Sequence, residues 1–324
     1  MIEQRSNTSV ILLCSVVFAL FVAFAPWEAI RGDEFADLVN YTTRIYLLRD
    51  YGKNYFVWEN SILGWLQFEY LWFSMLAWFA DMDVAPIVFI KSITLISAFL
   101  TYRFLSLYIG VGWSFLVLTN PITIDLLSSQ IRSAFAFALF LLAVSLRTGT
   151  KIDWLKYPLF ICLPFIHSGM HLLLLIYFSC VAMAHRDWFR PSTKTVITVI
   201  VAIITSVFIA LYLPAVAEIA EDRRALSQYA SKSAAYLSFW VLFAGALVIS
   251  YSKENSRHWE YYFAMSICIL GPLVELMNTP GFRFVALGIP VLFAAIIYLR
   301  GVVRDGVLLA SPLYSILLFY YWVR

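Results

Sequence analysis

Two arginines and a histidine stand where they could act on a phosphate group or a hydroxyl group. Arg132 lies in SSQIRSAFAF and Arg283 in NTPGFRFVALG, and each opens an apolar run after a break in the preceding helix. A charged side chain costs about 2.5–3.5 kcal/mol at the centre of a membrane helix. At a helix start, however, free backbone N–H groups and the helix dipole favour an anion, and a guanidinium adds parallel donors. We therefore expect both arginines to bind phosphate, with snorkelling towards lipid headgroups as the alternative for Arg132.

His167, in LPFIHSGMH, is a candidate general base, because imidazole titrates near neutral pH and this residue follows a predicted helix break. A structural hydrogen-bond role is the alternative, and His171 on the next turn is a rival. Arg223 and Arg224 are further candidate phosphate contacts, unless they only pair with their acidic neighbours in a solvated loop.

Four carboxylates could orient a sugar or accept a proton: Asp33, Asp37, Glu69 and Asp125. No two of them have a helical spacing that would force them together, so two-carboxylate chemistry is not predicted. The candidate substrate-binding residues are Arg31, Asp33, Glu69, Gln130, Arg223 and Arg224.

The composition places these residues in a membrane protein. Hydrophobic residues make up 62% of the chain and charged residues 13%, whereas soluble domains are about 45–50% apolar and about 25% charged. Apolar runs long enough to cross a bilayer core recur from end to end. The small net charge of +3 gives no support to nucleic-acid binding. The four cysteines lie inside apolar runs without metal or redox spacing, so we expect them to be buried small hydrophobes.

The expected fold is all-α, a polytopic integral membrane protein of about 10–12 transmembrane or re-entrant helices. It is expected to form one membrane domain over residues 1–324, with an extracytoplasmic loop at about 27–60. Helices are expected at 8–26, 85–102, 109–126, 130–146, 194–216, 233–251, 259–278, 282–299 and 306–323.

Several segments need a more specific prediction. Residues 155–184 should form a tight helical hairpin, broken near His167, and 61–80 should dip into the membrane or lie in its interface. The pair Asn120 and Pro121 should stop the helix before Arg132, and Ser128 or Ser129 could cap the next one.

The basic residues of the connections predict the orientation, because short cytoplasmic loops are enriched in Lys and Arg. The basic connections are 147–156, 186–194, 253–257 and 300–304. With these in the cytoplasm, Arg132, His167 and Arg283 all face the extracytoplasmic side.

The order of these motifs resembles the Wzy-type repeat-unit polymerases of the EpsG class. The resemblance is clearest over about 120–180, where NPITIDLLSSQIRSAFAFALFLLAVSL is similar to the family's Asn-Pro, Gln-Ile-Arg and Ala-rich helix. In the same region IHSGMHLLLL is similar to its His-x-Ser-Ala-Leu stretch, and RGDEFADLVNY, QFEYLWF and GFRFVAL match more loosely. The chain departs from the family at three places. No aromatic residue directly follows Asp33, no Pro-Gly follows Glu69, and Gly169 replaces an alanine.

The resemblance implies a GT-C-like glycosyltransferase, working without metal or cofactor at the periplasmic or outer face of the bacterial inner membrane. Such enzymes polymerise oligosaccharide repeats carried on undecaprenyl diphosphate into O-antigen, capsule or exopolysaccharide. The implied partners are these lipid-linked oligosaccharides, membrane lipid and a chain-length regulator. Arg132 and Arg283 would stabilise the leaving diphosphate, and His167 would deprotonate the acceptor hydroxyl. Asp33 or Glu69 would contact a sugar or act as an alternative base.

Three other classes of protein stay open. A ligase of similar architecture would move a finished glycan to another acceptor, and a flippase or transporter would line a path with intramembrane charges. A structural membrane subunit would leave the arginines unexplained beyond snorkelling. No GxxxxGK[ST], GxGxxG, HExxH or GxSxG occurs in the context it needs, so nucleotide-driven transport and zinc chemistry lack their usual markers.

Overall fold

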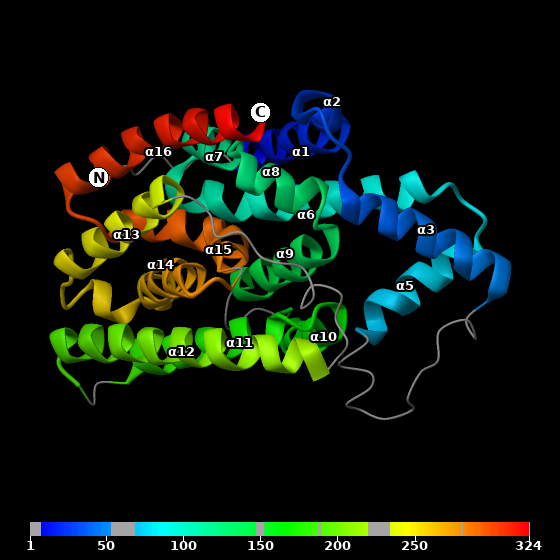
Figure 1. Ribbon diagram of the computed structural model, residues 1–324. Coiled ribbons are helices and arrows are strands. Elements are labelled where there is room, and N and C mark those ends of the chain that lie inside the picture. Colours follow the sequence, from blue (N-terminus) through cyan, green and yellow to red (C-terminus); the bar gives the residue numbers. More distant parts are fainter. Residues whose placement is uncertain are drawn as a thin grey trace. The chain divides into compact units, whose positions relative to one another are not determined.

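The computed structural model describes residues 8–52, 69–146, 152–186, 189–219, 234–279 and 281–323, and every regular element in these ranges is helical (Figure 1). The chain divides into two compact units. The first consists of Met1–Leu174 with Ser315–Arg324, and the second of Leu175–Tyr314. The chain passes from one unit to the other within α11 (Met170–His185) and within α16 (Gly301–Trp322).

The first unit is built around α6, which packs against α1 and α9. Small side chains on α6, such as Ser97, Ala98 and Thr101, are buried and let neighbouring helices approach closely. The helix α10 packs against α9 and α5, and α3 lies beside α5 (Figure 1). The helices of this unit are α1 (Thr8–Phe24), α2 (Trp27–Arg31), α3 (Ala36–Tyr51), α5 (Tyr70–Asp81), α6 (Pro86–Ile109), α7 (Val111–Leu118), α8 (Pro121–Ser128), α9 (Ile131–Ser145), η2 (Asp153–Leu155) and α10 (Lys156–Ile166).

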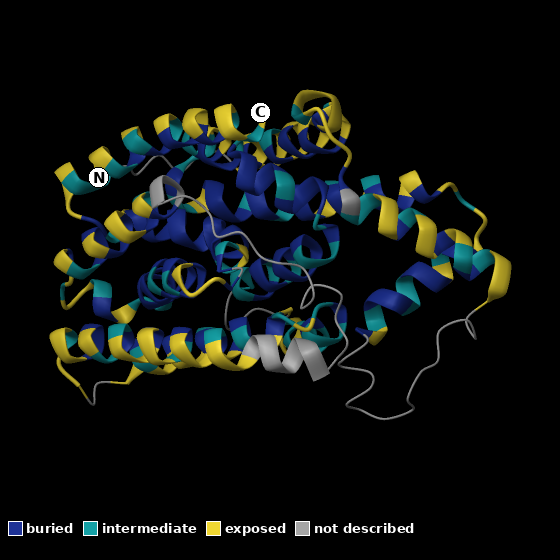
Figure 2. Cartoon of the chain, in the orientation of Figure 1, coloured by how far each residue is buried: buried dark blue, intermediate teal, exposed yellow. Residues whose placement is uncertain are grey.

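The second unit is built around α14, which packs against α12, α13 and α15 and is buried along most of its length (Figure 2). Glycines allow α14 and α15 to come close. A Cβ atom on Gly281 would lie 2.1 Å from the Gly271 carbonyl oxygen, which is far inside any permitted contact. The helices of this unit are α12 (Pro191–Ile219), α13 (Ala234–Ile249), η3 (Asn255–Arg257), α14 (Trp259–Leu276), α15 (Phe282–Ala294) and η4 (Ala295–Tyr298).

Length, apolarity and outward-facing side chains together define an α-helical membrane protein. Among the described residues, α6, α16 and the Pro191–Tyr212 part of α12 are long and apolar enough to cross a membrane. The pair α7 and α8, bent by 79°, makes a fourth span if it is counted as one. Many residues along α12 and α16 are exposed, as Figure 2 shows. Among the large apolar side chains, Leu13, Ile204 and Leu313 are each more than 60% exposed, as expected where the neighbouring medium is lipid.

Most expected helices form, with shifted ends. The helix expected at 85–102 extends to Ile109, and that at 306–323 begins at Gly301. The segment 155–184 forms two helices, α10 and α11, and the predicted break near His167 lies at 167–169. The side-by-side packing of a hairpin stays a prediction. Residues 61–68 lie outside the described ranges. The rest of 61–80 forms α5, whose 12 residues extend about 18 Å, less than a hydrocarbon core of about 30 Å.

The prediction of one helix at 109–126 is wrong. The segment forms two helices, α7 and α8, because Pro121 has no N–H to donate and keeps the preceding residue out of the helical conformation. The Asn120 side chain caps α8 by accepting the Ile122 N–H at 2.9 Å. The capping role expected for Ser128 or Ser129 is also wrong, since Ser128 is the last residue of α8 and Gln130, not a serine, directly precedes α9.

The segment predicted as a loop at 27–60 holds two helices in its described part, α2 and α3. The four cysteines are free, with Cys180 and Cys268 buried, as expected, and Cys14 and Cys162 only half-buried.

Candidate functional site

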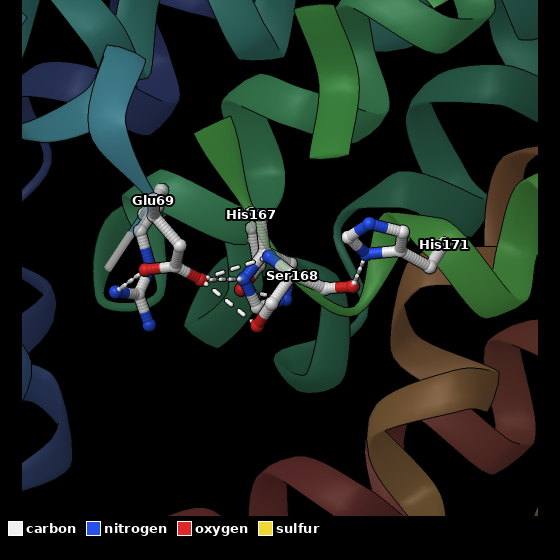
Figure 3. A network of polar contacts seen from close by, with 6 residues as sticks. Glu69, His167, Ser168 and His171 are labelled. Carbon is white, nitrogen blue, oxygen red and sulfur yellow. Dashed lines mark hydrogen bonds and ion pairs between the residues drawn. The ribbon is translucent and has the colours of Figure 1, made fainter. Parts of the chain in front are cut away.

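The carboxylate of Glu69 joins three segments of the first unit. Its Oε2 accepts a hydrogen bond from Arg132 Nη1, and its Oε1 lies 3.0 Å from His167 Nδ1. The Ser168 N–H and Ser168 Oγ also donate to Oε1, at 2.9 and 3.2 Å. Figure 3 shows Glu69, His167 and Ser168 turned towards one another. We call Glu69, Arg132, Ser133, His167 and Ser168 the Glu69 cluster.

The charged members of the cluster are largely removed from solvent. The Glu69, Arg132 and His167 side chains are 8%, 15% and 16% exposed. Burial alone would raise the pKa of the Glu69 carboxyl. The hydrogen bond to His167, the charge of Arg132 and the Ser168 N–H outweigh burial, so that this pKa lies below its ordinary value of 4.5. Glu69 is therefore an ionised carboxylate at neutral pH.

The backbone of Glu69 is strained. This residue directly precedes α5 and has φ 54° and ψ 57°, in the left-handed region that a side chain with a Cβ atom rarely adopts. Such a conformation costs about 1–3 kcal/mol and persists where surrounding contacts enforce it. Here the contacts to Arg132, His167 and Ser168 hold the carboxylate in place.

His167 is positioned by the end of α10. The helix stops at Ile166, and the His167 backbone is extended while its N–H still reaches the Leu163 carbonyl at 3.0 Å. With Nδ1–H donating to Glu69, the other ring nitrogen, Nε2, is the basic one, and Ser133 Oγ lies 3.2 Å from it. A carboxylate that fixes the tautomer of an imidazole is an arrangement used for general-base catalysis.

Gly169 leaves room for this imidazole. A Cβ atom built on Gly169 would lie 2.9 Å from His167 Nε2, closer than side-chain atoms normally approach. A side chain at this position would therefore crowd the imidazole.

Arg132 and Ser133 occupy the first turn of α9. Gln130 precedes the helix and provides no side-chain cap. The Arg132 guanidinium binds Glu69 through Nη1, while its Nε is buried without a hydrogen-bond partner among the described residues. A helix start with a cationic side chain and unused donors is suited to an anion.

A second group of predicted residues gathers in the same unit. Arg31 Nη1 lies 3.6 Å from Asp125 Oδ1, and Gln130 Nε2 donates to Asp125 Oδ2 at 3.1 Å. Asp33 is exposed, and its carboxylate accepts the Glu34 N–H at 2.9 Å. The structure thus brings Arg31, Asp125 and Gln130 together and leaves Asp33 outside both groups.

Arg283 belongs to the second unit. It is the second residue of α15 and is exposed. The preceding N–H, that of Phe282, donates to the buried carboxylate of Glu275 at 3.0 Å. The first N–H of α15 is therefore already bonded to a carboxyl group of the protein itself. Arg223 and Arg224 lie outside the described residues.

Ser133 and Ser168 were missed from the sequence, although each directly follows a predicted site residue. His171, the rival base, is exposed, and its Nδ1 lies 2.7 Å from the Ser168 carbonyl rather than beside a carboxylate. Comparison with protein-family models, curated proteins and solved structures found no match for this chain.

Proposed function

We propose that this chain is a membrane glycosyltransferase that polymerises oligosaccharide repeats linked to undecaprenyl diphosphate. The observation that carries the proposal is the Glu69–His167 pair, in which a buried carboxylate orients an imidazole beside the helix start that bears Arg132. The substrate class rests on the resemblance to the Wzy-type polymerases described above.

In the proposed reaction, the acceptor hydroxyl gives its proton to His167 Nε2, directly or through Ser133. Its oxygen bonds to the anomeric carbon of the donor repeat while the bond from that carbon to the diphosphate breaks. The diphosphate leaves with the electron pair, and the proton on His167 later passes to water. Glu69 stabilises the imidazolium that forms in between.

Arg132 has two roles in this proposal. It neutralises Glu69. Its remaining N–H groups, together with the start of α9, stabilise the negative charge of the departing diphosphate. No metal ion is required in this scheme. Arg31 and Gln130 are proposed as further contacts to the lipid-linked substrate, and Arg283, which belongs to the second unit, as a phosphate contact.

The proposed topology is GT-C-like, with about 10–12 membrane or re-entrant helices. It counts shorter apolar helices such as α1, α9 and α11 as membrane-embedded. The basic connections face the cytoplasm and the Glu69 cluster faces the opposite side of the bacterial inner membrane. A chain-length regulator is a proposed partner.

Purified protein in detergent, supplied with lipid-linked single repeats, tests the proposal. Wild-type protein should make polymer without a second compartment, which a flippase or transporter cannot do. His167→Ala should lower the rate by about 10²–10⁴-fold and Arg132→Ala by about 10²–10³-fold. Arg283→Ala should likewise leave single repeats.

Two matched variants serve as controls. His171→Ala removes the neighbouring imidazole, and Arg304→Ala removes an arginine that pairs with Asp305 at 3.1 Å. Both should keep wild-type activity. Polymer of normal length from His167→Ala and Arg132→Ala, at normal protein levels, would contradict the proposal. Long polymer left on undecaprenyl diphosphate in a deletion strain would instead favour a ligase.

A second candidate function is acyl transfer through Ser133, favoured by the 3.2 Å separation of Ser133 Oγ and His167 Nε2. Ser133 Oγ would attack an ester carbonyl as His167 takes its proton. The leaving alcohol would then receive that proton, and an acyl-serine would remain. A fluorophosphonate probe separates the two candidates. Labelling of Ser133 that His167→Ala abolishes supports acyl transfer, whereas polymerisation that survives in Ser133→Ala supports the glycosyltransferase.

A further inference from the structure

A cavity of about 320 Å³ lies in the first unit, between the end of α1 and helices α2, α3 and α6. Its volume is at the lower end of the range for ligand sites. Apolar and aromatic side chains form most of its wall, including Trp27, Phe35 and Ile87. Four polar side chains also line it, and Thr94 already donates to the Leu127 carbonyl at 3.2 Å. The three with a charge or an unused donor are Glu28, Lys91 and Ser128.

Ser128 is the most unusual of the three. The residue is 7% exposed, and its buried Oγ has no hydrogen-bond partner among the described residues. A buried hydroxyl without a hydrogen-bond partner is destabilising. Ser128 lines the cavity as a residue, and rotation about χ1 would turn this hydroxyl towards the cavity, where a ligand hydroxyl could donate to it or accept from it.

Lys91 and Glu28 supply opposite charges. Lys91 Nζ donates to the Ala23 carbonyl at the end of α1, which occupies one of its three N–H groups. Glu28 Oε1 accepts the Phe35 N–H at 3.0 Å, so that Oε2 can accept another donor. Because the two charges balance, the cavity favours neither a phosphate nor a cation.

We infer that this cavity binds a neutral sugar ring of the glycan substrate, away from the bond that is made. A sugar presents hydroxyl groups that both donate and accept, together with an apolar face that suits an aromatic wall. The inference rests on the proposed function, since it assigns one sugar subsite to the same substrate.

The chain itself connects the cavity to the Glu69 cluster. Ser128 ends α8, and Arg132 follows four positions later in the first turn of α9. Between them, Gln130 bonds to Asp125, which pairs with Arg31 at the end of α2. A sugar held in the cavity would therefore fix the position of the glycan along the same segment that carries Arg132.

Binding without turnover provides the test. The probe is the single-repeat oligosaccharide released by mild acid from the lipid-linked repeats of a deletion strain, which carries neither lipid nor diphosphate. Equilibrium dialysis with full-length protein should show that Ser128→Ala and Glu28→Gln each weaken binding by roughly fivefold, the effect of one hydrogen bond.

Thr123→Val is the matched control. Thr123 also lies in α8 with a buried, unpartnered hydroxyl, but it does not line the cavity. This variant should bind the oligosaccharide as the wild type does. Equal binding by all three variants, or displacement of the oligosaccharide by inorganic diphosphate, would overturn the inference.

The outcome is separable from that of the proposed function. If His167→Ala abolishes polymerisation while Ser128→Ala and Glu28→Gln bind normally, the enzyme assignment stands and the sugar subsite is wrong. If the wild type binds the oligosaccharide through Ser128 and Glu28 but makes no polymer, the sugar site stands and the polymerase assignment is wrong.

Discussion

At the scale of residues, Glu69 has a larger role than its sequence context indicates. The sequence predicts a sugar contact or an alternative base. In the structure, both carboxylate oxygens are already engaged by Arg132, His167 and Ser168. The geometry therefore favours a positioning role, in which Glu69 orients His167 and holds Arg132. Arg132 and His167 could be predicted from residue type and helix breaks. Their partner Glu69 could not, because it lies 63 positions from Arg132 and 98 from His167 and shares no local sequence pattern with them.

The ionisation of Glu69 predicts a pH dependence of stability. Its pKa in the folded protein is below 4.5, so its contribution to stability is complete above that pH and is lost as the pH falls through the lowered pKa. Glu69→Gln should lower the free energy of unfolding by roughly 3 kcal/mol at neutral pH, as for one partner of a buried pair. Thermal unfolding in detergent should show this deficit shrinking below about pH 4.5.

The exposed carboxylate Asp33 provides the control for this measurement. Asp33→Asn should leave the unfolding temperature unchanged throughout the same pH range. If the stability deficit of Glu69→Gln stays constant down to the lowest pH measured, the partners of Glu69 do not lower its pKa as described.

At the scale of elements, the glycine contact between α14 and α15 is the most restrictive packing feature. In Gly281→Ala, the new Cβ would meet the backbone at Gly271 and Glu275, neither of which can rotate away. We expect the variant to lose about 3 kcal/mol of unfolding free energy, the upper end for overpacking. Thermal unfolding measures this loss.

Gly245 is the matched control within α13. A Cβ atom there meets no other atom within 4 Å, and alanine is the better helix former by up to about 1 kcal/mol. Gly245→Ala should therefore be neutral or stabilising. A Gly281→Ala protein as stable as the wild type would mean that α14 and α15 do not pack as described.

The helices that could be predicted are those with long apolar runs, such as α6 and α12. The helix α3 was missed because ADLVNYTTRIYLLRDY contains many polar residues. It nevertheless buries Tyr41, Ile45 and Leu48, three and four positions apart, and Tyr41 packs on Trp72 of α5 with ring centres 5.5 Å apart. Tertiary contact with α5, which the sequence does not reveal, decides that this segment is a helix.

At the scale of the whole molecule, the first unit is completed by a segment from far along the chain. Ser315 Oγ accepts a hydrogen bond from Asn120 Nδ2 at 3.1 Å, and the Trp322 ring lies 6.4 Å from both Trp27 and Phe35. Trp322→Ala should cost about 1–3 kcal/mol, because it removes the aromatic contacts to Trp27, Phe35 and Phe319 from this unit.

Hydrogen exchange can locate this effect. Protection should fall in α1 and α2 of Trp322→Ala and stay unchanged in α13 and α14, which belong to the second unit. Tyr321→Ala is the control, since Tyr321 is 60% exposed. Equal loss of protection in both units would contradict the assignment of residues 315–324 to the first.

The inclusion of residues 315–324 in the first unit has a consequence for biosynthesis. The ribosome makes all of Leu175–Tyr314 before it makes residue 315, so the N-terminal part of the first unit lacks its last segment throughout the synthesis of the second unit. Chains of several units commonly fold from the N-terminal end during synthesis. Here the first unit, which carries His167 and Arg132, cannot complete its folding before residues 315–324 are made. A nascent chain that stalls before residue 315 would present uncovered Trp27 and Phe35 to chaperones and proteases, and quality control could recognise it there.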